Sequence, residues 1–545
     1  MDNNTTQKEK EIIINSIDDI EEILKNKLHP DQIESLDQFP DPFDLKNMQI
    51  AVDYFVEAIS NNKKIKCICD SDCDGLGTYT LFWNFFLKHF KYQYVEFIIT
   101  DRKQGYGFLP SHVTEDVSLY ITADNGITSV DATRKAREMG ANVIITDHHQ
   151  PDLELGLPDT PAIVDPHIPG DNFKYKDISG TFVLWFFLKA ICERLGLNVN
   201  LFNEFLPELG LTTISDVMPI DRHLNRFVVK SLTTGVQKNS IERIYFKTFR
   251  KFVSDSPTAE DIAFNLTPMI NATQRITKAD HGALFMIQET EEKSLEWFNY
   301  LKQVNDTRKK IQNDLFEYVE KHYRQYFDKD FIIIPGRFHK EYKSVAGIVA
   351  SKLVEKYNKP AIVFNFNPDT QEYSGSGRTA GKINILEILR DNKYVKQVGG
   401  HKQALGITVT LENFDNFYKE LLDKSARIPK EMFKSDIKSI GFIPFNYLDI
   451  SLYDSLKMFE PFGKDYERPI FRTEAIITKA KLIGKGKNHL SLELSDKNKL
   501  IKFKAMKFFT SEVPEINKEY SIYFKLGEDT FGSSRKLMLN IVSIE

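Results

Sequence analysis

The sequence contains few cysteines and no long apolar run. Only four cysteines occur in 545 residues, and three of them, Cys67, Cys69 and Cys73, lie close together. Because no fourth thiol or histidine stands nearby to complete a zinc site, we interpret the three as small core residues, and reduced cysteines are typical of a cytoplasmic protein. No stretch approaches the roughly 18 apolar residues of a membrane-spanning helix, and the polar residues 1–11 predict no signal peptide.

An excess of positive charge is also missing, since the net charge is −5. The chain as a whole is therefore not expected to attract nucleic acid, and any binding of DNA must come from a local basic patch. Internal repeats and low-complexity segments are absent as well. What remains is the composition of a soluble globular protein, with 41% hydrophobic residues and a length sufficient for roughly three or four domains.

The most informative stretch is CICDSDCDGLG, residues 67–77, in which a strand pattern ends in three alternating acids. Side chains alternate between the faces of a strand, so Asp70, Asp72 and Asp74 point the same way. Such carboxylates repel one another unless a cation lies between them, and hard divalent metals prefer oxygen ligands. The alternatives are an acidic surface loop or a calcium loop, but Leu81 occupies the position where an EF-hand needs glutamate.

Two later stretches repeat the arrangement of an apolar strand followed by polar side chains. LYITADNGIT, residues 119–128, contains an Asp-Asn-Gly turn, and VIITDHHQP, residues 143–151, contains an Asp-His-His run. Strands alternate with helical patterns here, which predicts a parallel sheet with crossover helices. Ligands bind at the carboxyl edge of such sheets, so the sequence predicts a metal site at this edge.

The order DxDxDG, DNGI and DHH resembles the DHH phosphoesterase superfamily and, within it, the RecJ group of single-strand-specific 5′→3′ exonucleases. The resemblance extends from about Phe39 to the C-terminus, and it implies two divalent cations, Mn²⁺ in first place with Mg²⁺ as the alternative. The metal ligands that it implies are Asp70, Asp72, Asp74, Asp124, His148 and Asp216, the last from the segment ELGLTTISDVMPIDRHLNR. Asp124 would bridge the two ions and act in catalysis. His149 would stabilise the pentavalent phosphate, and Asp147 would orient the histidine pair.

The contacts to the substrate also follow from this resemblance. The residues that it implies are Arg102 in DRKQGYG, Arg275 in PMINATQR, Ser376 and Arg378 in SGSGRTAGKINI, and His401 in VGGHKQALGI. Arg102, Ser376 and Arg378 would hold the 5′ phosphate of the strand. The chain departs from the family at Met269, where an arginine is usual, and at Gln274, where a glycine is usual. We therefore expect a different grip on the DNA backbone.

The resemblance and the patterns divide this α/β chain into five parts. They are a leader (1–38), a parallel-sheet DHH domain (39–288), a long connecting helix (289–327), a smaller α/β DHHA1 domain (328–435) and an all-β OB-fold (436–545). The connecting helix is indicated by an apolar helical period without proline or glycine. The OB-fold is indicated by short strands and local positive charge, because residues 471–545 contain 14 Lys and Arg against 9 Asp and Glu.

These features predict a metal-dependent exonuclease that degrades single-stranded DNA by a two-metal mechanism, in recombination, repair or replication. Single-stranded DNA is the expected partner, a helicase or a single-strand-binding protein is a further candidate, and a cytoplasmic monomer without membrane contact is expected. Two alternatives remain open. One is a phosphodiesterase for short oligonucleotides, which would not need the basic β-domain. The other is a non-catalytic replication scaffold that binds DNA, which would not need the acids.

Overall fold

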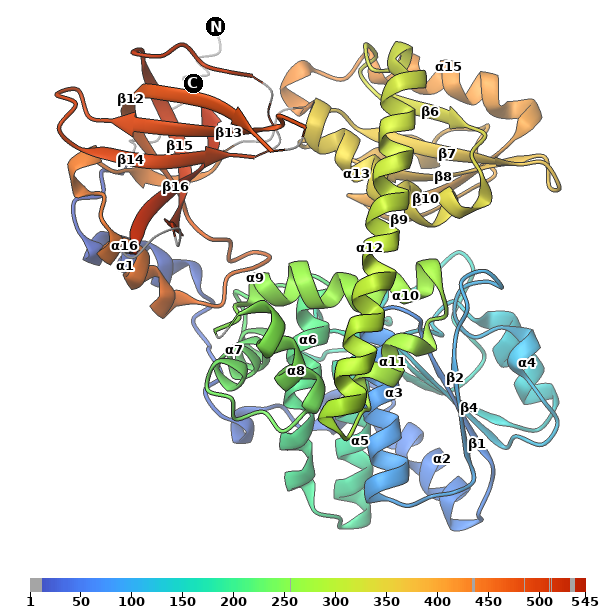
Figure 1. The fold of residues 1–545 in the computed structure, drawn as a ribbon. Helices are drawn as coiled ribbons and strands as arrows, with labels where there is room; N and C mark the ends of the chain where they lie inside the picture. The colour runs from blue at the N-terminus through green and yellow to red at the C-terminus, as the bar shows by residue number, and fades with distance from the viewer. Residues whose placement is uncertain are drawn as a thin grey trace, which may run out of the picture. The chain divides into compact units, whose positions relative to one another are not determined.

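The computed structural model describes residues 12–545 except 255, 434–436, 485, 509, 511 and 530–534, and it leaves out the side chains of residues 199–201 and 401. The chain forms two compact units; Figure 1 colours the ribbon along the sequence. The first unit consists of Asn26–Thr307 and Glu460–Glu467, and the second of Met1–Lys25, Arg308–Phe459 and Arg468–Glu545. Among the described residues, no helix has the length and apolar character needed to cross a membrane.

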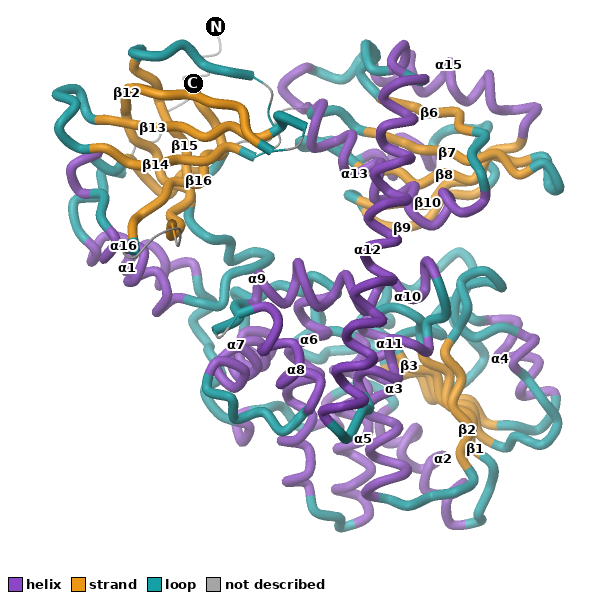
Figure 2. The backbone as a smooth tube through the Cα atoms, in the orientation of Figure 1, coloured by secondary structure: helices purple, strands orange, loops and turns teal. Residues whose placement is uncertain are grey.

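A parallel five-stranded sheet forms the centre of the first unit, in the order β2-β1-β3-β4-β5. Its strands are β1 (Ile65–Cys69), β2 (Val95–Ile99), β3 (Leu119–Ala123), β4 (Asn142–Thr146) and β5 (Ala162–Val164). Every residue of β1 and β3 is buried, because helices lie on both faces of the sheet (Figure 2). Strands covered in this way are mostly apolar along their whole length, and the predicted parallel sheet is confirmed.

The helices of the first unit form layers around this sheet. Those with contacts to its strands are α2 (Met48–Ser60), α3 (Cys73–Trp83), α4 (Val130–Glu138) and α5 (Gly180–Leu195). Helix α5 is apolar on almost every side, as expected for a helix that is buried among other elements. Further helices complete the unit, namely α6 (Leu206–Ser215), α7 (His223–Gln237), α8 (Ile244–Val253), α10 (Thr267–Ile276) and α11 (Asp280–Met286).

A single helix, α12 (Glu291–His322), leads along the chain from the first unit into the second. At a rise of 1.5 Å per residue, its 32 residues span about 48 Å. Phe298 and Leu301 belong to a core cluster of the first unit, whereas Leu315 and Val319 belong to a core cluster of the second. The predicted connecting helix is therefore confirmed.

The second unit contains a mixed five-stranded sheet, in the order β6-β7-β8-β10-β9. The strands are β6 (Ile332–Gly336), β7 (Ala361–Asn367), β8 (Glu372–Arg378), β9 (Gln397–His401) and β10 (Ala404–Thr410). β6 and β7 run parallel, and the other neighbours are antiparallel. Helices α13 (Ala346–Tyr357) and α15 (Phe414–Ser425) pack against this sheet, so the predicted smaller α/β domain is confirmed.

The remaining strands of the second unit close into the predicted barrel. They are β11 (Ser439–Phe442), β12 (Ile470–Ile483), β13 (His489–Ser495), β14 (Lys502–Lys507), β15 (Glu519–Asp529) and β16 (Lys536–Ile544). Closure comes from the pairing of β12 with both β13 and β15. The sequence predicts two strands on either side of Thr478, but the structure has the single strand β12 with a bulge between Ile477 and Lys479. A bulge bends a strand without ending it, so one strand serves both positions.

Candidate metal centre

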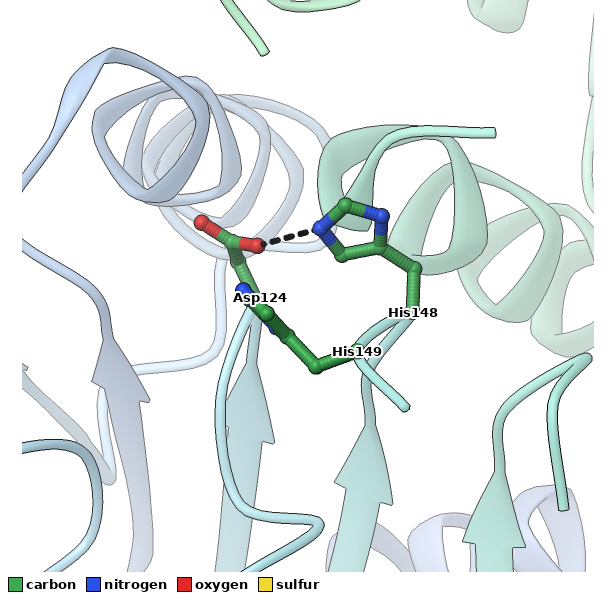
Figure 3. A group of neighbouring side chains, drawn as sticks. All are labelled: Asp124, His148 and His149. Atoms are coloured by element: carbon green, nitrogen blue, oxygen red, sulfur yellow. Dashed lines mark ion pairs between the residues drawn. The ribbon is translucent and has the colours of Figure 1, made fainter. Parts of the chain in front are cut away.

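The carboxyl ends of β1, β3 and β4 bring predicted acids and histidines to one edge of the sheet. Asp70 follows β1, Asp124 follows β3, and the run Asp147, His148 and His149 follows β4. Because neighbouring parallel strands present their carboxyl ends at the same edge, these side chains lie together. Figure 3 shows Asp124 and His148 pointing toward each other, with 3.2 Å between Asp124 Oδ1 and His148 Nε2.

All six predicted metal ligands lie within two groups of neighbouring side chains. In each group one ligand atom per residue lies within 4.8 Å of the others, and the groups are Asp70, Asp72 and Asp124, and Asp74, His148 and Asp216. A third group on the same criterion joins Asp124 to His148 and His149. Asp124 is therefore a neighbour of members of both ligand groups, which is the place that a bridging ligand needs.

Two polar atoms in these groups make no hydrogen bond in the described structure, although they lie 3.2 Å from each other as an ion pair. They are Asp124 Oδ1 and His148 Nε2, and both are buried, although buried polar atoms almost always find a partner. A divalent cation would satisfy both, because carboxylate oxygens and imidazole nitrogens are ligands for such ions. A set of several carboxylates with one imidazole suits Mn²⁺ or Mg²⁺. The residues present therefore fit the metals that the resemblance implies.

Crowding of the acids opposes their ionisation when no cation is bound. Burial, supported by the charges of Asp74 and Asp72, raises the pKa of Asp124 well above its ordinary value. Burial also raises the pKa of Asp216 to about 7, and it is the main reason that the pKa of Asp70 is raised. A cation between these carboxylates favours their charged form, so the electrostatics of the site also point to a metal.

The N-termini of two helices hold the acids of the first motif. Asp72 precedes α3 and caps its N-terminus, accepting hydrogen bonds from the N–H groups of Asp74 and Gly75, at 3.2 and 3.4 Å. Asp74 in turn accepts hydrogen bonds from the N–H groups of Gly180 and Thr181 at the start of α5, at 2.7 and 3.0 Å. A Cβ at position 75 would lie 2.3 Å from backbone atoms of the acid loop, so glycine is required there. Backbone donors at helix N-termini thus fix these carboxylates.

His149 is held as a charged group beside the predicted ligands. Its Nδ1 lies 2.7 Å from Asp147 Oδ1, and the same buried carboxylate accepts a hydrogen bond from the N–H group of Ile127 at 2.9 Å. Burial lowers the pKa of His149, but the charge and the hydrogen bond of Asp147 outweigh burial and raise it to about 10. The sequence did not single out Tyr106, whose hydroxyl lies 3.4 Å from His149 Nε2. The available signal was its place in the Gly-Tyr-Gly run that follows Arg102.

Arg102 lies against the acids in this structure. Its guanidinium is 2.7 Å from Asp70 and 2.9 Å from Asp72, and these two charges outweigh burial and raise its pKa. A groove of about 740 Å³ opens beside Arg102 and is also lined by Ser71 and Gln274. A cationic side chain, the acids and a groove thus adjoin one another within the first unit.

Helix α10 supplies contacts to the acid loop that no sequence pattern indicated. Asn271 Oδ1 accepts a hydrogen bond of 2.8 Å from the N–H group of Cys73, and Gln274 Oε1 accepts one of 3.0 Å from the hydroxyl of Ser71. Gln274 therefore makes a contact that the glycine usual in the family could not make. Met269 is 6% exposed and packs in the hydrophobic core, so this second departure places an apolar side chain in the core.

The remaining predicted substrate residues lie on three other elements. Arg275 lies near the end of α10, in the first unit. Ser376 and Arg378 lie two residues apart on β8 of the second unit, next to Gly347 of α13, whose Cβ position is 3.0 Å from Arg378 Nη2. A hydroxyl beside a guanidinium is an arrangement able to hold an anion. The side chain of His401 lies outside the described residues.

Three family descriptions match separate parts of the chain. They are the DHH family, N-terminal domain, over residues 64–206, the DHHA1 domain over residues 336–426, and the RecJ OB domain over residues 441–543. Together they cover more than half of the chain. Their order is the order predicted from the sequence.

Several curated proteins are similar to this chain along most of its length. The protein named single-stranded-DNA-specific exonuclease RecJ of Bacillus subtilis (strain 168) is 30% identical over 487 residues, which is 84% of this chain and 58% of that protein. The protein of the same name in Haemophilus influenzae is 25% identical over 568 residues, which is 98% of this chain and 94% of that protein. The chain thus spans less than two thirds of the first relative and almost all of the second.

Two solved structures have a similar fold. The crystal structure of RecJ in complex with Mn²⁺ from Thermus thermophilus has a TM-score of 0.76 and 23% identity, and the match covers 92% of this chain and 72% of that one. The crystal structure of exonuclease RecJ bound to manganese has a TM-score of 0.58 and 26% identity, covering 71% of this chain and 96% of that one. Since three domain matches occur in the RecJ order and the acids and histidines gather at one sheet edge, the chain belongs to the DHH/DHHA1 phosphoesterase superfamily and, within it, to the RecJ group.

Proposed function

We propose that the protein is a metal-dependent exonuclease that hydrolyses single-stranded DNA from its 5′ end. The observation that carries this proposal is the presence of two neighbouring groups of ligands. Asp124 belongs to one group and lies 3.2 Å from His148 of the other. Two divalent cations at such a site activate water and stabilise the charge that develops on a phosphodiester during in-line displacement. The names of the similar proteins, which are single-stranded-DNA-specific exonucleases, support the substrate class.

The acids and one histidine are proposed to hold two cations. Asp70, Asp72 and Asp124 would hold one ion, and the other would be held by Asp74, Asp124, His148 and Asp216. Mn²⁺ is proposed first, because a similar exonuclease structure contains manganese. Mg²⁺ is the alternative, since it prefers the same oxygen donors.

His149 is proposed to donate a hydrogen bond to a non-bridging oxygen of the scissile phosphate. Asp147 occupies its Nδ1 at 2.7 Å, so Nε2, which has the Tyr106 hydroxyl as a neighbour at 3.4 Å, is the nitrogen that would face the substrate. A pKa of about 10 keeps the ring protonated at neutral pH. A charge-assisted hydrogen bond strengthens as negative charge builds on the phosphate, so this contact favours the transition state. Asp147 keeps the ring charged and oriented.

Arg102 is proposed to release its carboxylate partners and bind the 5′ phosphate. It now pairs with Asp70 and Asp72, and once these carboxylates are neutralised its guanidinium can turn to a phosphate in the adjoining groove. Guanidinium groups bind phosphate through two parallel hydrogen bonds, which gives both affinity and geometry. Further contacts to the strand are proposed for Arg275, Ser376, Arg378 and His401.

We also propose the finer assignments that follow from the resemblance. The domain limits are a leader (1–38), a DHH domain (39–288), a connecting helix (289–327), a DHHA1 domain (328–435) and a single-strand-binding OB-fold (436–545). The protein would act as a cytoplasmic monomer in recombination, repair or replication, alone or with a helicase or a single-strand-binding protein. All four cysteines are free and buried, which is consistent with a reducing compartment.

The test is hydrolysis of one DNA sequence labelled at either end, with Mn²⁺ and with full-length protein. We expect a labelled mononucleotide to leave the 5′-labelled strand first, while the 3′-labelled strand shortens stepwise. A duplex of the same sequence is the control for strand specificity, and Asp124→Ala is the control for contaminating nucleases. Preferential cleavage of dinucleotides would favour the short-substrate phosphodiesterase. Binding of single strands without cleavage would favour the scaffold.

A further inference from the structure

A short segment near the C-terminus belongs to the first unit although the chain on both sides of it belongs to the second. This return segment is Glu460–Glu467. Gly463 and Tyr466 exchange backbone hydrogen bonds of 3.0 and 3.2 Å, and the rings of Phe462 and Tyr466 stack with 5.5 Å between their centroids. Both rings are almost fully buried, so the return segment is an ordered part of the unit that carries the acids.

The return segment contacts the loop that follows the predicted ligand Asp216. We call residues 216–220 the Asp216 loop. The backbone carbonyl of Lys464 accepts a hydrogen bond of 3.0 Å from the N–H group of Ile220, the last residue of this loop. Arg226 of α7 donates a hydrogen bond of 3.0 Å to the carbonyl of Pro461, and its guanidinium lies 4.6 Å from the centre of the Tyr466 ring.

The Asp216 loop has a conformation that must be held in place. Val217 has a φ of +55°, and a β-branched residue rarely adopts this left-handed conformation. Such strain persists only where the surrounding structure fixes it. The N-terminal end of the loop is held by α6, through the hydrogen bond of 2.9 Å from the N–H group of Asp216 to the carbonyl of Thr212. The C-terminal end is held by Lys464 and by Asn225, which donates to the carbonyl of Pro219 at 2.9 Å.

The position of the Asp216 carboxylate depends on the backbone of its own loop, whereas the Asp74 carboxylate is also held by another helix. The carboxylate of Asp74 accepts two backbone hydrogen bonds from the start of α5. The carboxylate of Asp216 instead forms an ion pair with His148, at 3.6 Å from Nε2. The backbone of the Asp216 loop therefore decides where this carboxylate lies.

We propose that the return segment is a positioning element for the metal ligand Asp216, with Arg226 and Tyr466 acting through the Asp216 loop. The inference rests on the proposed metal centre but not on the proposed substrate. Arg226 contacts the return segment at Pro461 and Tyr466, and the proposed effect of this pair is to keep the strained loop in the conformation that directs Asp216 toward His148. Groups behind a ligand set metal affinity by fixing the ligand's orientation.

The test measures Mn²⁺ binding to full-length variants without DNA, by titration calorimetry and by the EPR signal of free Mn²⁺. Tyr466→Leu removes the ring beneath Arg226, and we expect one of two Mn²⁺ ions to bind about tenfold more weakly, at the lower end of the loss usual for such groups. Tyr466→Phe keeps the ring and is expected to bind as the wild type does. Val236→Ala is the matched control, because Val236 is buried in the same helix, α7, far along from Arg226.

Steady-state kinetics separate positioning from a general loss of structure. In Tyr466→Leu we expect the Mn²⁺ concentration for half-maximal hydrolysis to rise, kcat to recover in excess Mn²⁺ and KM for DNA to stay constant. If this variant fails to fold, Gly463→Ala decides, because its Cβ would lie 2.7 Å from Ile220 Cδ1 and press on the Asp216 loop. Weaker Mn²⁺ binding by Gly463→Ala would support the inference, and unchanged binding would overturn it.

The inference is also overturned if folded Tyr466→Leu binds two Mn²⁺ ions as tightly as Val236→Ala does. Failure of the proposed function would look different. The wild type would then bind Mn²⁺ without cleaving single strands, and the comparison of Mn²⁺ affinities would still decide the role of the return segment.

Discussion

Replacing Gly180 by alanine is expected to disable the metal centre while leaving the fold intact. Gly180 is the first residue of α5, and its N–H group donates a hydrogen bond of 2.7 Å to Asp74 Oδ2. The other side of the residue faces Asp124. Gly180 therefore lies between a proposed terminal ligand and the proposed bridging ligand, where an added methyl group has no free space.

The size of the clash follows from the structure. A Cβ at position 180 would lie 2.5 Å from Asp124 Oδ1 and 2.8 Å from Asp124 Cα, whereas ordinary contacts begin at 3.4 Å. The missing distance is thus about 0.6–0.9 Å. A new rotamer of Asp124 cannot relieve a clash with its Cα, so either its backbone or the start of α5 must move. Misplacement of reacting groups by about 1 Å costs roughly 100-fold in rate, and overpacking costs about 1–3 kcal/mol of stability.

The opposite end of the same helix provides the control. Gly196 directly follows α5 and caps it with a φ of +64°, and a Cβ there would meet no atom within 4 Å. Gly196→Ala is expected to cost about 1–2 kcal/mol of stability through the left-handed backbone conformation, without any contact to the acids. The two variants are therefore matched in stability and differ in what they do to the metal centre.

The assay is steady-state hydrolysis of single-stranded DNA at saturating Mn²⁺, with the melting temperature measured in parallel. We expect Gly180→Ala to lose about 100-fold or more in kcat and Gly196→Ala to keep nearly the wild-type value. If both variants melt at similar temperatures and retain similar kcat values, the arrangement of Asp74 and Asp124 in this structure is not the working one.

Three further predictions concern charge, phosphate and base contacts. Mn²⁺ should raise the melting temperature more at pH 8 than at pH 5, because the pKa of Asp216 is raised to about 7. In the metal-free protein, the contribution of Asp216 to stability is complete below its ordinary pKa of 3.8 and is lost as the pH rises through about 7. Equal Mn²⁺-induced shifts of the melting temperature at pH 5 and pH 8, measured by calorimetry, would contradict this. Arg378→Ala should reduce the ratio of kcat/KM for 5′-phosphorylated over 5′-hydroxyl strands, whereas Arg337→Ala, a change at an exposed arginine of the same unit, should not. Phe508→Ala should weaken binding of long single strands about fivefold or more, because this ring is 50% exposed. The assay is anisotropy in Ca²⁺, with Leu500→Ala as the non-aromatic control. Unchanged affinity of Phe508→Ala would show that the ring does not stack on a base.

The edge of the parallel sheet could be predicted from the sequence because its causes are local. Apolar runs of strand length end directly before Asp70, Asp124 and Asp147, and alternation with helices fixes the strands as parallel. Parallel neighbours present the same end to solvent, so residues that follow different strands meet. The family resemblance was needed for Asp216, because it lies at the C-terminal end of α6, where no strand pattern marks it.

Other contacts of the site depend on segments that are distant in the sequence. Asn271 and Gln274 reach the acid loop from about 200 residues away, and no pattern within α10 shows which loop its side chains meet. The barrel gives a second example, because Phe524 is fully buried and Phe508 is half-exposed although both lie in similar basic and aromatic surroundings. Phe524 lies on β15 opposite Phe471 of β12, whereas Phe508 follows the end of β14, and composition does not reveal this difference.

The return segment also has a consequence for biosynthesis. About 160 residues separate Thr307, where the main part of the first unit ends, from Glu467, where the return segment ends, and a ribosome that adds 5–20 residues per second needs roughly 10–30 s to cover them. During this interval the nascent chain already carries every proposed metal ligand, but the return segment does not yet contact the Asp216 loop. A chain that ends before residue 467 would therefore lack the complete return segment and bind Mn²⁺ more weakly, so cleavage activity is expected to arise late in translation.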